Sequence, residues 1–145
     1  MEKMEKLKRL QEVCQEKGLR LTVQKRMILE NMLSRHDHPT ADQVFQEVQK
    51  KIPGISRATV YRILDNLVEE GLILKISHPD SSGRYDGNTD RHHHLICSHC
   101  HQVEDIFIPP EQEPDLSHLV QNNMKVKNYT IYFEGLCPNC KNIHN

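Results

Sequence analysis

The stretch SRATVYRILDNLVEEG, residues 56–71, decides the fold of the N-terminal half. Its apolar side chains recur at i, i+3, i+4 and i+7, the spacing of one buried helix face, and they are Val60, Ile63, Leu64 and Leu67. Ser56 is a typical N-cap residue, and Gly71 is typical of the position after a helix end. The first turn and the opposite face are polar and carry Arg57, Thr59, Tyr61, Arg62, Asp65 and Asn66.

Three further helices are predicted upstream of this stretch. Residues 4–17 place apolar side chains at helical spacing, and Gly18 follows them. Thr22 can cap a second helix, and Thr40 with Gln43 forms the capping box of a third. The chain upstream of residue 56 therefore supplies three helices to pack beneath the fourth.

A hairpin is predicted downstream. Residues 72–78 are apolar and β-branched, residues 79–83 form a turn, and residues 84–86 can return as a second strand. Helices followed by a hairpin favour a winged helix-turn-helix, whose recognition helix enters the major groove of DNA. The alternative for the polar face of residues 57–66 is an ordinary solvated surface.

Bulk composition permits two small domains. The chain has 145 residues, 37% of them hydrophobic. Residues 1–78 carry 14 basic and 11 acidic side chains, whereas residues 79–145 carry 5 and 9, so the basic excess lies in front. We find no apolar run of membrane-spanning length and no secretory pattern, and we expect a cytoplasmic protein with no membrane partner.

Four of the five cysteines form two Cys-x-x-Cys pairs separated by 36 residues. Two intervening residues let both thiolates of a pair reach one ion, and four thiolates close a tetrahedral Zn²⁺ site. We predict a structural zinc, with each pair ending its own strand pair; the ligands are Cys97, Cys100, Cys137 and Cys140. A thioredoxin-like redox pair is the alternative, but it requires a pair that opens a helix. Cys14 lies on the apolar face of the first helix and is expected to be buried.

A second cluster consists of Asp86, His92, His94 and Asp105. In a strand His92 and His94 face the same side, while His93 points the other way and is expected at the surface. Two imidazoles with carboxylates and no thiolate suit divalent ions such as Fe²⁺, Mn²⁺ or Zn²⁺. A merely polar strand is the alternative.

Taken together, the chain resembles the ferric-uptake-regulator family along almost its whole length. The matching stretches are residues 18–22, 38–42, 58–62, 84–86, 92–100 and the final Cys-x-x-Cys. The resemblance implies an α+β fold with a winged-helix domain (residues 1–78), a hinge and wing (79–87) and a small α/β dimerisation domain (88–145). It also implies a homodimer on a pseudo-palindromic, double-stranded DNA operator.

The resemblance also implies site residues. It adds His38 to Asp86, His92, His94 and Asp105 as ligands of a regulatory Fe²⁺ or Mn²⁺. Arg20 resembles a family position that enters the minor groove. The expected DNA contacts are Arg20, Arg57, Thr59, Tyr61 and Arg62. Tyr129 and His93 stand where relatives often place a histidine and an aspartate, which disfavours a third metal site.

The two aspartates resemble the peroxide-stress branch of the family, since iron-uptake regulators typically have glutamates at these positions. We therefore predict a peroxide-sensing repressor of oxidative-stress genes. Arg62 after Tyr61 is instead similar to the iron-uptake branch, which is the main alternative; a zinc-uptake regulator fits less well. A metalloenzyme or thiol oxidoreductase needs a cleft and an acid/base group beyond the ligands, and we identify neither, so we predict no enzyme.

Overall fold

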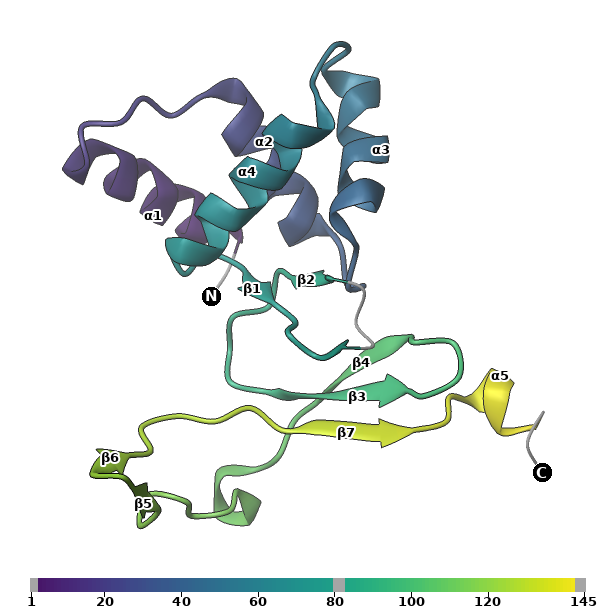
Figure 1. Ribbon diagram of the computed structural model, residues 1–145. Helices are drawn as coiled ribbons and strands as arrows, with labels where there is room; N and C mark the ends of the chain where they lie inside the picture. The colour runs from purple at the N-terminus through teal and green to yellow at the C-terminus, as the bar shows by residue number, and fades with distance from the viewer. Residues whose placement is uncertain (1–2, 80–82, 143–145) are drawn as a thin grey trace. The chain divides into compact units, whose positions relative to one another are not determined.

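The computed structural model describes residues 3–79 and 83–142. The chain divides into two compact units, residues 1–90 and 91–145. The predicted turn at residues 79–83 lies partly outside the described residues. Each unit is built around its own elements, which are labelled in Figure 1.

The first unit begins with four helices, as the sequence predicts. They are α1 (Lys3–Glu16), α2 (Val23–Ser34), α3 (Ala41–Lys51) and α4 (Arg57–Glu69). The hydroxyls of Thr22, Thr40 and Ser56 each accept a backbone hydrogen bond at the N-terminus of α2, α3 and α4. The capping box of Thr40 and Gln43 is present in full. All three predicted helix starts are thus confirmed.

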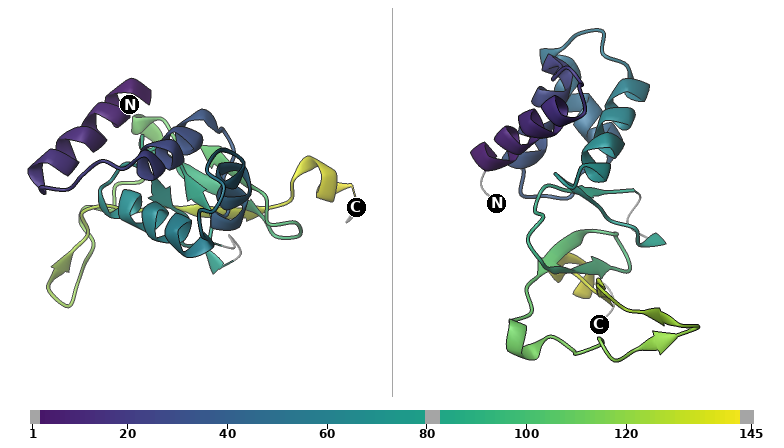
Figure 2. Two further views of the ribbon diagram at one scale, coloured as in Figure 1. Left: turned by 90° about the horizontal axis from the view of Figure 1, so that it is seen from above. Right: turned by 90° about the vertical axis from the view of Figure 1, so that its left-hand side faces the viewer.

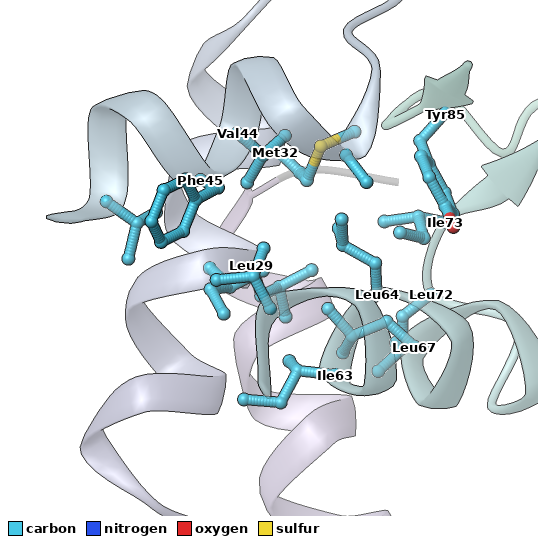
Figure 3. Close-up of a cluster of buried hydrophobic side chains, with 14 of the residues drawn as sticks. Leu29, Met32, Val44, Phe45, Ile63, Leu64, Leu67, Leu72, Ile73 and Tyr85 are labelled. Carbon is cyan, nitrogen blue, oxygen red and sulfur yellow. The ribbon is translucent and has the colours of Figure 1, made fainter. Parts of the chain in front are cut away.

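The core of this unit lies between α2, α3 and α4, with α1 packed on α2 (Figure 1). Figure 3 shows side chains from the helices and the following strand region converging on one cluster. The complete predicted stripe of α4 is buried there: Val60, Ile63, Leu64 and Leu67. Cys14 belongs to the same core and is 2% exposed, which confirms its packing role.

A short hairpin completes the first unit. Strand β1 (Leu74–Lys75) pairs antiparallel with β2 (Tyr85–Asp86), and the four helices plus this wing form a winged-helix unit. The segment predicted as hinge and wing, residues 79–87, thus contributes β2 to this hairpin. Gly87 follows β2 where a Cβ atom would lie 2.7 Å from the carbonyl oxygen of Met32, so only glycine fits at this point.

The second unit contains a three-stranded sheet of order β4-β3-β7. Strand β3 (His93–Cys97) runs antiparallel to β4 (Val103–Ile106) and parallel to β7 (Tyr132–Gly135). The chain between β4 and β7 makes a 3₁₀ turn (Pro110–Gln112) and then the hairpin of β5 (Val120–Gln121) and β6 (Met124–Lys125). Figure 2 shows this hairpin projecting away from the sheet.

A final short helix, α5 (Pro138–Lys141), follows β7 at the end of the sheet opposite the β5–β6 hairpin (Figure 1). Within residues 3–79 and 83–142, none of the helices combines the length and apolar character needed to cross a membrane.

Candidate metal centres and nucleic-acid interface

The two Cys-x-x-Cys pairs meet at one end of the second unit's sheet. Cys97 ends β3 and Cys137 follows β7. Because these strands are parallel neighbours, both cysteine pairs lie at the same end of the sheet. The Sγ atoms of the four cysteines all lie within 4.8 Å of one another, and those of Cys100 and Cys137 are 3.7 Å apart. Four sulfurs around one tetrahedral Zn²⁺ lie about 3.8 Å from one another, so the cluster fits zinc.

The thiols of this cluster differ in acidity. Backbone N–H groups of Cys100 and Cys137 stabilise the Cys97 thiolate and lower its pKa to about 5. Burial raises the pKa of the Cys140 thiol to about 12. The Cys97 thiol is therefore the readier of the two to lose its proton to a bound metal ion.

One detail of the cysteine prediction is wrong. The pairs do not end separate strand pairs: they follow adjacent strands of the same sheet, because β7 returns parallel to β3. The second pair also opens a helix, with Cys137 as the N-cap residue of α5. That feature is shared with redox pairs, but the sulfurs of Cys97 and Cys100 lie beside it and make a four-thiolate cluster.

The first unit brings His38 and Asp86 together. Nε2 of His38 lies 3.4 Å from Oδ2 of Asp86, and both side chains are buried. The loop before α3 is tied to β2 by three interactions: the Thr40–Arg84 bridge, the Tyr85 N–H to Pro39 carbonyl bond, and the bond from Arg84 to the His38 carbonyl. The same loop that carries His38 is thus held beside the strand that carries Asp86.

The second unit brings His92, His94 and Asp105 together. His94 and Asp105 are direct partners across the β3–β4 pair, and Oδ1 of Asp105 lies 3.2 Å from Nε2 of His92 and 3.7 Å from Nε2 of His94. The two imidazole rings are 4.7 Å apart, which confirms that they share one side of the strand. Two imidazoles converging on a carboxylate are the donors expected for a borderline divalent ion.

The prediction that His93 lies at the surface is wrong, since this side chain is 0% exposed. The far face of β3 is covered by the segment between β4 and β7. Nε2 of His93 lies 2.8 Å from Oε1 of Glu113, and Nδ1 accepts a hydrogen bond from the Ile131 amide. Tyr129 stacks on the imidazole and donates to Oε2 of Glu113.

Arg91 also belongs to this cluster. Its guanidinium lies 4.6 Å from the centre of the Tyr129 ring, and its Nε lies 3.4 Å from Oε1 of Glu113. The hydrogen bond from Tyr129 is the main reason that the pKa of Glu113 is lowered. The carboxylate already has an internal cation and two hydrogen-bonding partners.

The candidate DNA-contacting residues fall into two groups. Tyr61 and Arg62 are exposed side by side on α4, and Arg20 is exposed just before α2. Arg57 instead forms a 2.9 Å ion pair with Asp42 and stacks on the Phe45 ring. The Thr59 hydroxyl lies 2.8 Å from that of Ser56 at the helix start.

Several residues that support these sites are not predicted from the sequence. Arg84 holds the His38 loop, Glu113 holds β3 through His93, and Lys6 donates from α1 to the carbonyl of Gly87 beside Asp86. Arg84 lies in a matched stretch of sequence, which is the one signal that could have found it. Lys6 shows no such signal because its helix face is otherwise defined by apolar residues.

A winged-helix unit followed by a small sheet with a four-thiolate cluster defines the class of metal-binding transcription regulators. Comparison with known proteins specifies the class. The model of the ferric uptake regulator family matches residues 16–134. The peroxide-responsive repressor PerR of Staphylococcus epidermidis is 35% identical over 126 residues, which cover 86% of this chain and 83% of the relative.

Two solved structures agree in fold. The Helicobacter pylori ferric uptake regulator Fur has a TM-score of 0.83 at 24% identity and covers 97% of this chain and 95% of its own. PerR from Streptococcus pyogenes has a TM-score of 0.51 at 28% identity, with 90% of each chain covered. The chain belongs to the ferric uptake regulator family, and it is a metalloregulator of transcription and not an enzyme.

Proposed function

We propose that the protein is a peroxide-responsive repressor whose affinity for its operator is controlled by Fe²⁺ or Mn²⁺. The observation that carries this proposal is the pair of buried or half-buried aspartates, Asp86 and Asp105, each beside ligand-type histidines. The similarity to peroxide-responsive relatives over most of the chain supports it.

The regulatory ion would take its ligands from both units. His38 and Asp86 belong to the first, and His92, His94 and Asp105 to the second. Neither group alone supplies more than three ligands, fewer than the six that octahedral Fe²⁺ or Mn²⁺ commonly accepts. An ion shared by both groups would favour the arrangement of the units in which all five ligands converge. It shifts that equilibrium only as far as it binds this arrangement more tightly than others.

His38, Asp86, His92, His94 and Asp105 would hold the ion; as iron(II) it would supply the electrons that reduce hydrogen peroxide, which manganese(II) would do far less readily. The imidazoles that would hold the ion are then exposed to oxidation, and we expect His38 or His92 to be the one modified. The net reaction transfers one oxygen atom from H₂O₂ to a ring carbon and releases one water molecule. An oxidised imidazole is a poorer ligand, so the metal-dependent arrangement and the operator complex would be lost together.

The DNA contacts that we propose follow the geometry of α4. Arg62 can donate two hydrogen bonds to a guanine in the major groove, and Tyr61 can contact a thymine methyl group or a phosphate. Arg20 would enter the minor groove at the start of α2. Arg57 and Thr59 would act at the beginning of α4, where Arg57 must first exchange its partner Asp42 for a phosphate.

A homodimer would present two such helices to a pseudo-palindromic operator. Strand β7 is an edge of its sheet, and Phe133 and Leu136, at and beyond it, are 38% and 41% exposed. An edge strand with exposed apolar side chains is suited to pairing with a second copy of the chain.

The test compares iron-loaded and manganese-loaded protein after brief exposure to micromolar peroxide. The iron form should leave its operator and gain one oxygen atom on His38 or His92, seen by peptide mass spectrometry. The manganese form should stay bound and unmodified. An iron form whose histidines survive intact would support the alternative of an iron-uptake regulator, which the Tyr61–Arg62 pair favours.

A further inference from the structure

A buried lysine lies next to the segment that carries a proposed metal ligand. Lys6 is only 3% exposed, although it lies on α1 among the apolar side chains that face the core. Its ammonium group donates a hydrogen bond to the carbonyl oxygen of Gly87, the residue after Asp86. A buried ammonium group needs a compensating charge, because its desolvation is costly.

That compensation comes from the segment after β2. Burial lowers the pKa of Lys6, and the charges of Asp90 and Asp86 partly offset this by favouring the protonated form. The segment itself is tightly placed. Gly87 packs against the Met32 carbonyl, and Oδ1 of Asp86 accepts the Asn88 amide at 2.8 Å. Lys6 therefore donates to the backbone of the residue next to Asp86, in a segment that these two contacts hold in place.

A metal ion bound at Asp86 would lie near the positive charge of Lys6. An ammonium group and a divalent ion repel each other, and repulsion between buried charges is weakly screened by water or salt. The Lys6 ammonium, placed at the Gly87 carbonyl, interacts favourably with the charges of Asp90 and Asp86, and an ion bound at Asp86 would weaken that interaction.

We propose that Lys6 sets the affinity of the regulatory site by acting as an internal counter-cation that divalent metal must overcome. The proposal rests on the proposed function, because it requires a metal at Asp86. Lys6 is a positioning residue: it holds the Asp86 segment through Gly87 and weakens metal binding through its charge. The metal concentration at which the regulator responds is then raised by a residue outside the coordination sphere.

The experiment titrates zinc-loaded, full-length protein with Mn²⁺ and compares four substitutions. Lys6→Met removes the charge and the donor, whereas Lys6→Gln removes the charge and keeps a donor. Lys6→Arg keeps the charge. Lys8→Met removes a charge from the exposed face of the same helix and is the matched control.

We expect Lys6→Met and Lys6→Gln to tighten Mn²⁺ binding at least about fivefold. The Mn²⁺ concentration for half-maximal operator binding should fall by the same factor. Lys6→Arg and Lys8→Met should stay within about twofold of the original protein. If both neutral variants fold with full zinc content and bind Mn²⁺ equally or more weakly, Lys6 only fills space and the proposal is overturned.

An Asp86→Asn variant separates this outcome from failure of the proposed function. If the original protein binds Mn²⁺ and Asp86→Asn abolishes it, the regulatory site stands and the Lys6 variants decide the proposal. Mn²⁺ binding that is absent, or indifferent to Asp86, overturns both. Should Lys6→Met fail to fold, Lys6→Gln decides the proposal in the same way.

Discussion

The guanidinium of Arg84 donates a 2.7 Å hydrogen bond to the carbonyl oxygen of His38, joining two positions 46 residues apart in the chain. This bond and the neighbouring Thr40–Arg84 bridge hold the loop before α3 against β2. His38 and Asp86 are therefore placed beside each other by contacts within the first unit.

Arg84→Met should weaken Mn²⁺ binding about tenfold, because supporting residues around a metal site typically contribute 10–100-fold to affinity. Calorimetric titration of the zinc-loaded protein measures the effect. Arg26→Met, which removes an exposed arginine paired with Glu30 on α2, is the control. Equal affinity of the two variants would show that the His38 loop needs no such support.

Zinc should be present at about one tightly held ion per chain. Cys97→Ser or Cys140→Ser should lose both the ion and the dimer, since the binding energy of a structural zinc is also folding energy. Metal analysis and sedimentation check the two losses. Cys14→Ala, which changes a cysteine outside the cluster, should keep the ion; a zinc-free protein that remains a folded dimer would contradict the assignment.

Arg62→Ala should cost about 1–3 kcal/mol of discrimination at one operator position, because a bidentate contact to guanine is lost. Arg20→Ala should instead weaken binding to all sequences evenly and reduce its salt dependence. Binding assays on single-base operator variants at two salt concentrations distinguish these effects. Unchanged affinity and selectivity of Arg62→Ala would show that α4 is not the reading helix.

Asp105→Glu should keep metal-dependent DNA binding and blunt the response to peroxide. The added methylene changes the point from which the carboxylate reaches the metal, while the charge is retained. Operator release and histidine oxidation after peroxide treatment of the iron form are the measurements, and Glu104→Asp on the same strand is the control. If the variant responds to peroxide as strongly as the original protein, Asp105 has no special role in peroxide sensing.

Glu113 should contribute stability that depends on pH. Its folded-state pKa is lowered, first by the hydrogen bond from Tyr129, from an ordinary value of 4.5. A lowered carboxyl pKa stabilises the fold above that ordinary value, and the contribution disappears as the pH falls through the folded-state pKa. The original protein should therefore unfold at a higher urea concentration than Glu113→Gln, and this difference in midpoint should be larger at pH 6.5 than at pH 3.5.

Glu111→Gln changes an exposed carboxylate on the same turn and is the matched control for this comparison. Both variants share the acid sensitivity of the cysteine cluster, so only the difference between them reports on the Glu113 contacts. Parallel loss in the two variants would mean that the Tyr129 and His93 contacts add no stability.

The helical part of the fold can be predicted from the sequence because its signals are local. Each of Thr22, Thr40 and Ser56 caps the helix that follows it, and the stripe of α4 is buried as its spacing predicts. The four-cysteine cluster was equally predictable, since the two residues between the cysteines of each pair let both thiolates reach one ion. The parallel pairing of β3 with β7 was not, because no local pattern records which distant strand becomes a neighbour.

The errors and omissions at the sites have the same physical origin. Alternation along β3 correctly placed His93 opposite His92 and His94, but burial of that face depends on Glu113 and Tyr129, which follow much later in the chain. Likewise the pairing of Arg57 with Asp42 depends on how α3 and α4 pack. Side-chain chemistry is local, whereas its partners are set by tertiary structure.

The parallel neighbours β3 and β7 also fix an order of events during synthesis. Strand β3 can pair at once with β4, but its other edge must wait until residues 132–135 have been made. Until then a strand that is largely buried in the folded unit exposes unpaired backbone groups, which favours association with other chains. Zinc binding by the second cysteine pair would hold β7 against β3 and cover this edge. The fraction of newly made protein that aggregates should therefore fall as the zinc supply rises.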